Sequence, residues 1–462
     1  MKTTSRLPPE LIAALAARFN ERFSISPGIC EHHGTDESSL PPAPPDGVVF
    51  AQSTEEVSAA VAMCHTYRIP VIAYGTGTSL EGHLHAVHGG ICVDLSGMDQ
   101  VLAIRSEDLD ATVQPGVTRK GLNAALHGSG LFFPIDPGAD ASIGGMAATR
   151  ASGTNAVRYG TMRESVLAMT VVLADGRIIQ TGSRAKKSAA GYDLTRLFVG
   201  AEGTLGIITE LTVRLHPLPE SITGAVCTFP TIAAAVDTVI QTIQLGVPVA
   251  RIELLDTLSV TAINRYSKTT LREAPTLFFE LHGSPAGVAE QTQVVQEIAA
   301  EHGGLDFAWA DRPEERSRLW QARHDAYYAC LGLQPGARSL TTDVCVPISR
   351  LAECIAASLD DLAQTGLTAP LLGHVGDGNF HMLLLVNPDD TVTFEQAREF
   401  TQRLAERAIT MDGTCTGEHG IGLGKRKYMV LEHGVEALTA MRAIKQALDP
   451  HNLMNPGKIL PD

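Results

Sequence analysis

The sequence predicts an α+β protein with more than one domain. The chain has 462 residues, which is too long for one simple core, so we expect two or three domains. Strand-like runs alternate with helical patterns on both sides of a proline-rich stretch at 217–219, which marks a boundary near residue 220. Hydrophobic residues make up 44% of the chain and charged residues 19%, as in a folded enzyme.

The first half begins with helices and continues mainly as strands. A helix over 8–20 has two prolines at its start and apolar residues along one face. A second helix begins at a capping box formed by Ser53 and Glu56 and ends near residue 67. The strands are predicted over 48–51, 71–74, 91–95, 111–114, 166–173 and 206–215.

After residue 220 the alternation restarts, which indicates a second α+β domain. The predicted strands lie near 225–229, 249–254 and 276–282, and the predicted helices near 231–245, 286–302 and 435–448.

Composition excludes several classes of protein. The net charge of −15 argues against a nucleic-acid partner. No run approaches the ~18 apolar residues that a transmembrane helix needs, and no apolar stretch follows the charged N-terminus. The eight scattered cysteines form no Cys-x-x-Cys, which suits reduced thiols. We therefore expect a cytoplasmic protein, with peripheral contact at the inner face of a membrane left open.

The segment 373–381 predicts a pair of metal ligands. Asp377-Gly378 is a strong signal for a two-residue hairpin turn. With the turn centred there, His374 opposes His381 on one face, with Cβ atoms roughly 5 Å apart. Two imidazoles at that distance can share one metal ion. The same pair also fits a half-buried strand pair without a metal.

A second glycine-rich turn contains Glu418 and His419 side by side. Two neutral imidazoles and one carboxylate form a common catalytic metal set, which leaves coordination positions open for substrate. Glu418 is the candidate third ligand, and His419 then lies next to the metal as a base. The alternative is a loop in which both side chains are solvated. Histidine and carboxylate suit zinc, and also manganese or iron.

Three glycine-rich segments are candidates for a nucleotide site. Segment 74–82 follows a strand, and its glycines let backbone N–H groups approach phosphate oxygens. No amphipathic helix follows, so it is not a Rossmann fingerprint, and we argue against NAD there. Segment 137–148, which continues to residue 155, suits an extended dinucleotide, and the third segment is 201–208. Each also fits a tight turn in a β-rich domain.

In their order and spacing these segments resemble the FAD domain of the vanillyl-alcohol oxidase/p-cresol methylhydroxylase superfamily. The rest of the chain resembles the FAD-linked oxidase C-terminal domain, and within it the D-lactate dehydrogenase (cytochrome) group. The segments that carry this second resemblance are 319–324, 342–350, 373–381, 413–424 and 449–458.

The resemblance implies three regions. An N-terminal helix and loop at 1–44 precede a PCMH-type FAD-binding domain at 45–220, made of two α/β subdomains. An α+β substrate and metal domain follows at 221–462, and its last fifty or so residues are expected to pack back toward the flavin.

The resemblance also implies FAD as the cofactor. Many superfamily members tether the flavin through a histidine where this chain has Thr76-Gly77-Thr78, so we expect non-covalent FAD. His83 is the nearest alternative tether. The residues expected to line the cofactor are Tyr74, Gly75, Thr76, Gly77, Thr78, Ser79, Gly82, Pro137, Gly138, Ser142, Gly144, Gly145, Ala148, Ser152, Gly153, Gly203 and Ile208.

For the reaction, the resemblance implies oxidation of a D-2-hydroxy acid, with D-lactate to pyruvate as the leading case. A zinc or manganese ion on the two histidines and Glu418 lowers the pKa of the substrate hydroxyl. His419 removes the proton, and the Cα hydride passes to flavin N5. Arg323 is expected to bind the substrate carboxylate through its planar fork, and Asn379 to contact the substrate.

Other substrates, acceptors and functions stay open at this point. D-2-Hydroxyglutarate dehydrogenases and glycolate oxidase D subunits are close relatives of the same group. The electron acceptor is a cytochrome, a quinone or an electron-transfer flavoprotein. Different classes of function are a metal-dependent hydrolase built on the same three ligands, or a non-catalytic subunit of a larger complex.

Overall fold

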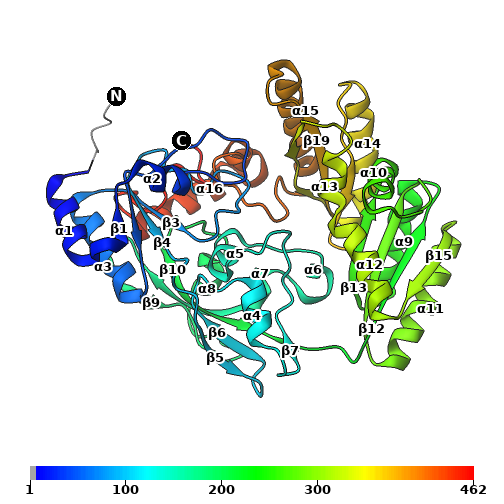
Figure 1. The fold of residues 1–462 in the computed structure, drawn as a ribbon, viewed down its shortest axis with the longest axis horizontal. Helices are drawn as coiled ribbons and strands as arrows, with labels where there is room; N and C mark the ends of the chain where they lie inside the picture. Colours follow the sequence, from blue (N-terminus) through cyan, green and yellow to red (C-terminus); the bar gives the residue numbers. More distant parts are fainter. Residues whose placement is uncertain (1–6) are drawn as a thin grey trace. The chain divides into compact units, whose positions relative to one another are not determined.

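The computed structural model describes residues 7–462 as two compact units (Figure 1). The first unit comprises the described chain up to Ser152, then Gly160–Leu218 and Glu418–Asp462. The second comprises Gly153–Tyr159 and Pro219–Gly417. Each unit is therefore assembled from stretches that are distant in the sequence.

The first unit contains a small sheet with the strand order β1-β2-β4-β3. Its strands are β1 (Phe23–Ser24), β2 (Gly47–Phe50), β3 (Val71–Tyr74) and β4 (Ile91–Asp94), of which the last three run parallel. Helices α1 (Pro9–Phe19) and α3 (Thr54–Tyr67) share an apolar core with this sheet. Ser53 caps α3 as predicted by accepting the Glu56 N–H, but the Glu56 carboxylate accepts the N–H of Gln52 and completes no capping box.

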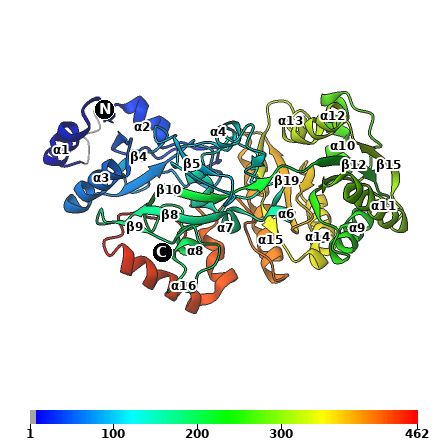
Figure 2. The same ribbon diagram turned by 90° about the horizontal axis from the view of Figure 1, so that it is seen from below.

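A five-stranded antiparallel sheet forms the rest of this unit, in the order β5-β6-β10-β8-β9. Its strands are β5 (Val101–Arg105), β6 (Asp110–Val113), β8 (Val166–Val172), β9 (Ile178–Gln180) and β10 (Ile207–Arg214). Helix α16 (Met429–Leu448) belongs to the same unit (Figure 2). Its Leu448 packs against the core of this sheet. This helix begins earlier than the predicted 435 and is interrupted at Gly434, where φ is 75°.

The smaller elements of the first unit are α2 (Pro27–His33), α4 (Arg119–Ala125), α5 (Ile143–Thr149), α7 (Met162–Ser165), α8 (Leu194–Phe198), β7 (Leu131–Phe132) and β11 (His216–Pro217).

The second unit is built on an antiparallel sheet in the order β15-β12-β14-β13-β18-β19-β16. The strands are β12 (Ser221–Thr228), β13 (Val249–Leu255), β14 (Thr276–Gly283), β15 (Leu305–Ala310), β16 (Arg338–Thr341), β18 (Leu371–Gly373) and β19 (Asn379–Val386). A short strand, β17 (Val344–Cys345), also pairs with β19.

Helices cover both faces of this sheet, because its central strands are apolar on both sides. Leu277 and Phe279 of β14 join one core and Phe278 joins the other. The first face carries α9 (Ile232–Gln244), α11 (Pro285–Glu301), α14 (Leu351–Ala363) and α15 (Thr391–Thr410). The second carries α10 (Thr257–Ser267), α12 (Pro313–His324) and α13 (Ala326–Leu331), and α6 (Ala156–Tyr159) packs against β13. No helix within residues 7–462 combines the length and low polarity needed to cross a bilayer.

Candidate functional site

The glycine segments converge in the first unit at the end of β3. An ideal Cβ at Gly75 would lie 2.6 Å from Ser142 Oγ, so the first two segments touch where only glycine fits. The third segment joins them at Gly203, which lies next to Ala73 of β3.

The expected cofactor residues lie on several elements. Tyr74 ends β3, residues 75–82 form the following turn, and 137–142 precede α5. Gly144, Gly145 and Ala148 lie within α5, and Ile208 lies in β10. Ser152 closes a segment of the first unit, whereas Gly153 begins a segment of the second.

The second half of segment 137–148, for which no helix was predicted, is helical. That half is the helix α5, which begins where Ser142 accepts the Gly145 N–H at 3.3 Å. Small residues in this stretch allow close packing of a helix as readily as an extended backbone.

The turn after β3 has the features of a phosphate cradle. Gly77 has a φ of 75°, and an ideal Cβ there would lie 2.6 Å from the Tyr74 hydroxyl. Within residues 7–462, the backbone N–H groups of Thr76, Gly77 and Thr78 donate to no protein acceptor. Such donors suit the oxygens of a pyrophosphate, and the residues here therefore fit a bound dinucleotide.

The first unit also contains Glu418 and His419, both half-buried. Ser152 Oγ donates to Glu418 Oε2 at 3.0 Å. Ser152, which we expected beside the cofactor, thus fixes the orientation of the expected metal ligand.

The two candidate ligands of the second unit lie together, but not through the predicted turn. The register pairs Leu372 with His381, two residues away from the predicted pairing of His374 with His381. The chain turns over 374–378, and φ is positive at Gly378 but not at Asp377, whereas a type I′ turn needs both. A shift of two residues keeps every side chain on its face.

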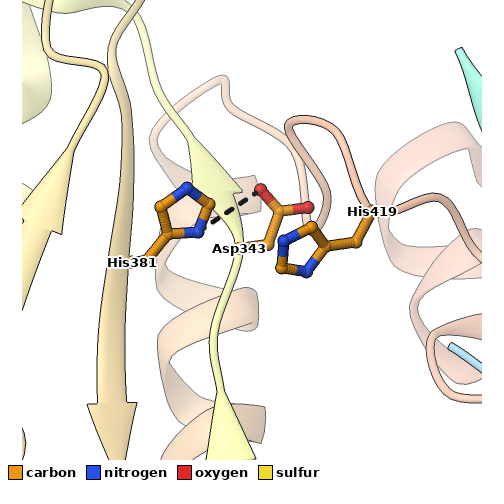
Figure 3. A group of neighbouring side chains, drawn as sticks. All are labelled: Asp343, His381 and His419. Carbon is orange, nitrogen blue, oxygen red and sulfur yellow. Dashed lines mark ion pairs between the residues drawn. The ribbon is translucent and has the colours of Figure 1, made fainter. Parts of the chain in front are cut away.

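Both imidazoles are oriented through Nδ1. The ring centroids of His374 and His381 lie 5.4 Å apart, with an interplanar angle of 81°. His374 Nδ1 lies 2.7 Å from Glu253 Oε1, and His381 Nδ1 lies 2.9 Å from the Thr342 carbonyl oxygen. Asp343 Oδ1 also approaches His381 Nδ1, at 4.0 Å (Figure 3). A neutral imidazole that donates a hydrogen bond through Nδ1 has its lone pair on Nε2. Two such Nε2 atoms fit as ligands of a metal ion.

Glu253 links His374 to Arg323. Arg323 Nη2 donates to Glu253 Oε2 at 2.6 Å, and both side chains are buried. Burial alone would raise the pKa of Glu253, but His374 and Arg323 hold it below its ordinary value. One edge of the Arg323 fork is therefore used inside the protein, and its contact with a substrate carboxylate stays a prediction.

Asn379 also has internal partners. Its Nδ2 donates to Asp343 Oδ1 at 2.9 Å and to the Val344 carbonyl oxygen at 2.8 Å. Both amide hydrogens are thus used, so the predicted substrate contact of Asn379 would have to involve Oδ1.

Glu253 and Asp343 were not among the predicted site residues. The signal for Glu253 was a carboxylate inside the apolar strand 249–255, where an ionised group requires partners. For Asp343 we find no comparable signal.

Two family models match successive parts of the chain, and the second begins at residue 218. A model of the FAD binding domain matches residues 45–182, and a model of the FAD linked oxidases, C-terminal domain, matches residues 218–459. The chain belongs to the FAD-linked oxidase family. The predicted resemblance is confirmed, and this FAD-linked oxidase is a flavoprotein oxidoreductase.

Similarity to individual relatives of this FAD-linked oxidase extends over nearly the whole chain. A probable mitochondrial D-lactate dehydrogenase of Danio rerio is 56% identical, over 96% of this chain and 89% of the relative. A mitochondrial D-lactate dehydrogenase [cytochrome] of Arabidopsis thaliana is 47% identical, over 99% and 81%. A glycolate oxidase subunit of Bacillus subtilis is 36% identical, over 90% and 89%.

Among solved structures, p-cresol methylhydroxylase with substrate bound shares the fold of this FAD-linked oxidase. The TM-score is 0.82 at 18% sequence identity, and the match covers 98% of this chain and 96% of the other. The predicted fold class, a PCMH-type FAD-binding domain followed by an FAD-linked oxidase C-terminal domain, is confirmed.

Proposed function

We propose that this FAD-linked oxidase oxidises D-lactate to pyruvate and passes the electrons to a cytochrome or a quinone. The observation that carries the proposal is the 41–56% identity to D-lactate dehydrogenases of four organisms, which extends through both domains. Bound FAD would supply the two-electron acceptor for the substrate. Its attachment is proposed to be non-covalent, since residues 76–78 contain no histidine.

We also propose a zinc or manganese site on His374, His381 and Glu418. Support comes from the Nδ1 contacts of the two rings, which favour the tautomer with Nε2 as ligand atom. A divalent ion bound there would polarise the substrate hydroxyl.

His419 is the proposed base for the hydroxyl proton, because an imidazole accepts protons near neutral pH. Arg323 is proposed to hold the substrate carboxylate with the part of its guanidinium that does not contact Glu253. Asn379 Oδ1 is the proposed acceptor for a second polar group of the substrate.

Glycolate is a second candidate substrate, favoured by the similarity to glycolate oxidase subunits. D-2-Hydroxyglutarate is a further alternative for the same chemistry. A metal-dependent hydrolase has no use for the FAD domain that this chain contains, so we do not propose it.

Anaerobic flavin bleaching tests the proposal. The purified protein should be yellow, and D-lactate should bleach the flavin rapidly whereas L-lactate should not. Chelation should abolish bleaching, and zinc or manganese should restore it. Bleaching by glycolate or D-2-hydroxyglutarate alone would replace the substrate and keep the chemistry. A colourless protein that takes up no FAD would reject the flavoenzyme, and bleaching that survives complete metal removal would reject the metal site.

A further inference from the structure

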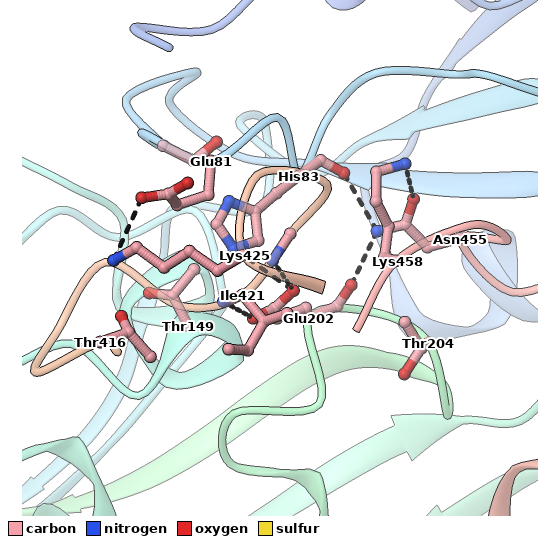
Figure 4. A network of polar contacts seen from close by, with 12 residues as sticks. Glu81, His83, Thr149, Glu202, Thr204, Thr416, Ile421, Lys425, Asn455 and Lys458 are labelled. Carbon is pink, nitrogen blue, oxygen red and sulfur yellow. Dashed lines mark hydrogen bonds and ion pairs between the residues drawn. The ribbon is translucent and has the colours of Figure 1, made fainter. Parts of the chain in front are cut away.

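The first unit contains a buried polar cluster that the proposed chemistry does not use. Glu202, His83, Asn455 and Lys458 are each at most 6% exposed (Figure 4). They come from the third glycine segment, from the turn after the first, and from the C-terminal region. Burying polar and charged groups costs desolvation free energy unless hydrogen bonds and ion pairs compensate for it.

Glu202 holds the backbone of the loop that follows Glu418 and His419. Its Oε1 accepts the Ile421 N–H at 2.7 Å, and its Oε2 accepts the Gly422 N–H at 2.8 Å. Only a carboxylate offers two acceptor oxygens to two neighbouring amides at once.

Two other members of the cluster, His83 and Asn455, contact Glu202. His83 Nε2 lies 3.3 Å from Glu202 Oε2. Asn455 Nδ2 donates to the carbonyl oxygens of Glu202, at 2.8 Å, and of His83, at 3.0 Å (Figure 4). Glu202 itself has a φ of 52°, a left-handed conformation that is unfavourable for a residue with a side chain. The surrounding bonds maintain this conformation.

Electrostatics support a charged pair. Burial alone would raise the pKa of Glu202, but His83 and the two loop amides lower it. Burial alone would lower the pKa of His83, but Glu202 raises it above the ordinary value.

Glu81 also contacts this loop, through its backbone carbonyl and its side chain. The Glu81 carbonyl oxygen accepts the N–H groups of Leu423, at 2.7 Å, and Gly424, at 3.2 Å. Lys425 Nζ lies 3.2 Å from Glu81 Oε1 (Figure 4). The loop 420–425 is therefore attached to residues of two glycine segments that the FAD site uses.

We propose that Glu202 is a positioning residue, which fixes the loop that carries Glu418 and His419 relative to the FAD-binding segments. The inference rests on the proposed roles of those two residues. It assigns to Glu202 no contact with substrate or cofactor.

Glu202→Gln is the decisive variant. Glutamine keeps the volume but offers one oxygen, and it places an NH2 group against one of the two loop amides. Hydrogen exchange at Ile421 and Gly422 should become roughly tenfold faster or more, while exchange in β3 and the FAD content stay as in wild type. kcat should fall roughly 10- to 100-fold, with a smaller change in KM. Glu210→Gln is the matched control, because Glu210 lies on β10 and accepts from Thr170 Oγ1.

The exchange measurement separates this inference from the proposed function, because it needs no substrate. Unchanged exchange at Ile421 and Gly422 would overturn the inference, as would faster exchange with an unchanged kcat. Faster exchange in a protein whose wild type does not oxidise D-lactate would support the Glu202 contacts and reject the substrate.

Gly420→Ala is a second test, for the case in which Glu202→Gln does not fold. It disturbs the contact between Glu202 and the loop from the side of the loop. In Gly420→Ala, the new Cβ would lie 2.7 Å from His83 Nε2 and 2.8 Å from Glu202 Oε1, at a φ of 83°. Faster exchange at Ile421 and Gly422 is expected here too, and wild-type exchange would again overturn the inference.

Discussion

At the scale of single residues, Glu253 determines how His374 can act. The carboxylate is fully buried and has two partners, the His374 imidazole and the Arg323 guanidinium. These two partners offset the cost of burying the Glu253 carboxylate, and loss of Arg323 would leave its charge uncompensated. The contact at Nδ1 also orients the ring and favours the tautomer in which Nε2 could bind the proposed metal ion.

His419→Ala tests the proposed base. The variant should keep FAD and metal, because neither is bound by His419 in this scheme, and kcat should fall by about 100-fold or more. Steady-state kinetics with D-lactate, together with flavin absorbance and metal analysis, provide the measurement. His433→Ala, in α16 and paired with Glu432, is the control and should stay near wild type. Near-normal turnover of His419→Ala would refute the assignment.

The sequence predicted the two histidines better than their surroundings. A two-residue error in register leaves side chains on the same face of the sheet. The prediction that His374 and His381 are neighbours was therefore correct, although the predicted turn was wrong. Glu253 lies 121 positions from His374 and meets it only because β13 pairs with β18. Such a contact depends on strand order, which local patterns do not encode.

At the scale of elements, the turn after β3 packs directly against the N-terminus of α5. The turn has to contain glycine at 75 because the N-cap of α5 occupies the space of a side chain. A strand with a continuous apolar run, such as residues 91–93 of β4, was predictable for the same reason that it is buried. α5 was not, because glycine and alanine in a seven-residue helix give no amphipathic period.

Gly75→Ala should disrupt the packing of this turn against the N-cap of α5. The added methyl group would meet Ser142 Oγ at 2.6 Å, so the turn or the cap must move, and FAD occupancy should drop severalfold at equal protein concentration. Removing the hydroxyl in the double variant Gly75→Ala/Ser142→Ala should restore much of the occupancy, at a cost of about 1 kcal/mol for the lost cap. Flavin absorbance per chain and thermal unfolding measure both effects. Equal occupancy in wild type and Gly75→Ala would show that the contact is unimportant.

At the scale of the whole molecule, the last segment completes the first unit. Val71 of β3 donates to the Leu453 carbonyl oxygen at 2.8 Å, and Asn455 N–H donates back to Val71 O at 2.8 Å. Met454, between them, is fully buried in the core of the small sheet. Because β3 is an edge strand of that sheet, residues 453–455 cover groups that would otherwise be unpaired.

A chain that ends at Gly417 should therefore lose FAD altogether, and its first unit should unfold at a lower temperature. Flavin content after gel filtration and thermal unfolding are the measurements. Deletion of Pro461 and Asp462 alone serves as the control and should leave both unchanged. Full flavin content in the longer deletion would contradict the role assigned to 453–455.

The interrupted path of the chain has a consequence during translation. The ribosome makes β3 early, but after the first unit's middle segment it must still synthesise residues 219–455 before the residues that cover β3 are complete. At about 5–20 residues per second this takes roughly 12 to 47 seconds. For that interval the nascent first unit has an open strand edge, and that edge is where a chaperone would protect the growing polypeptide from aggregation.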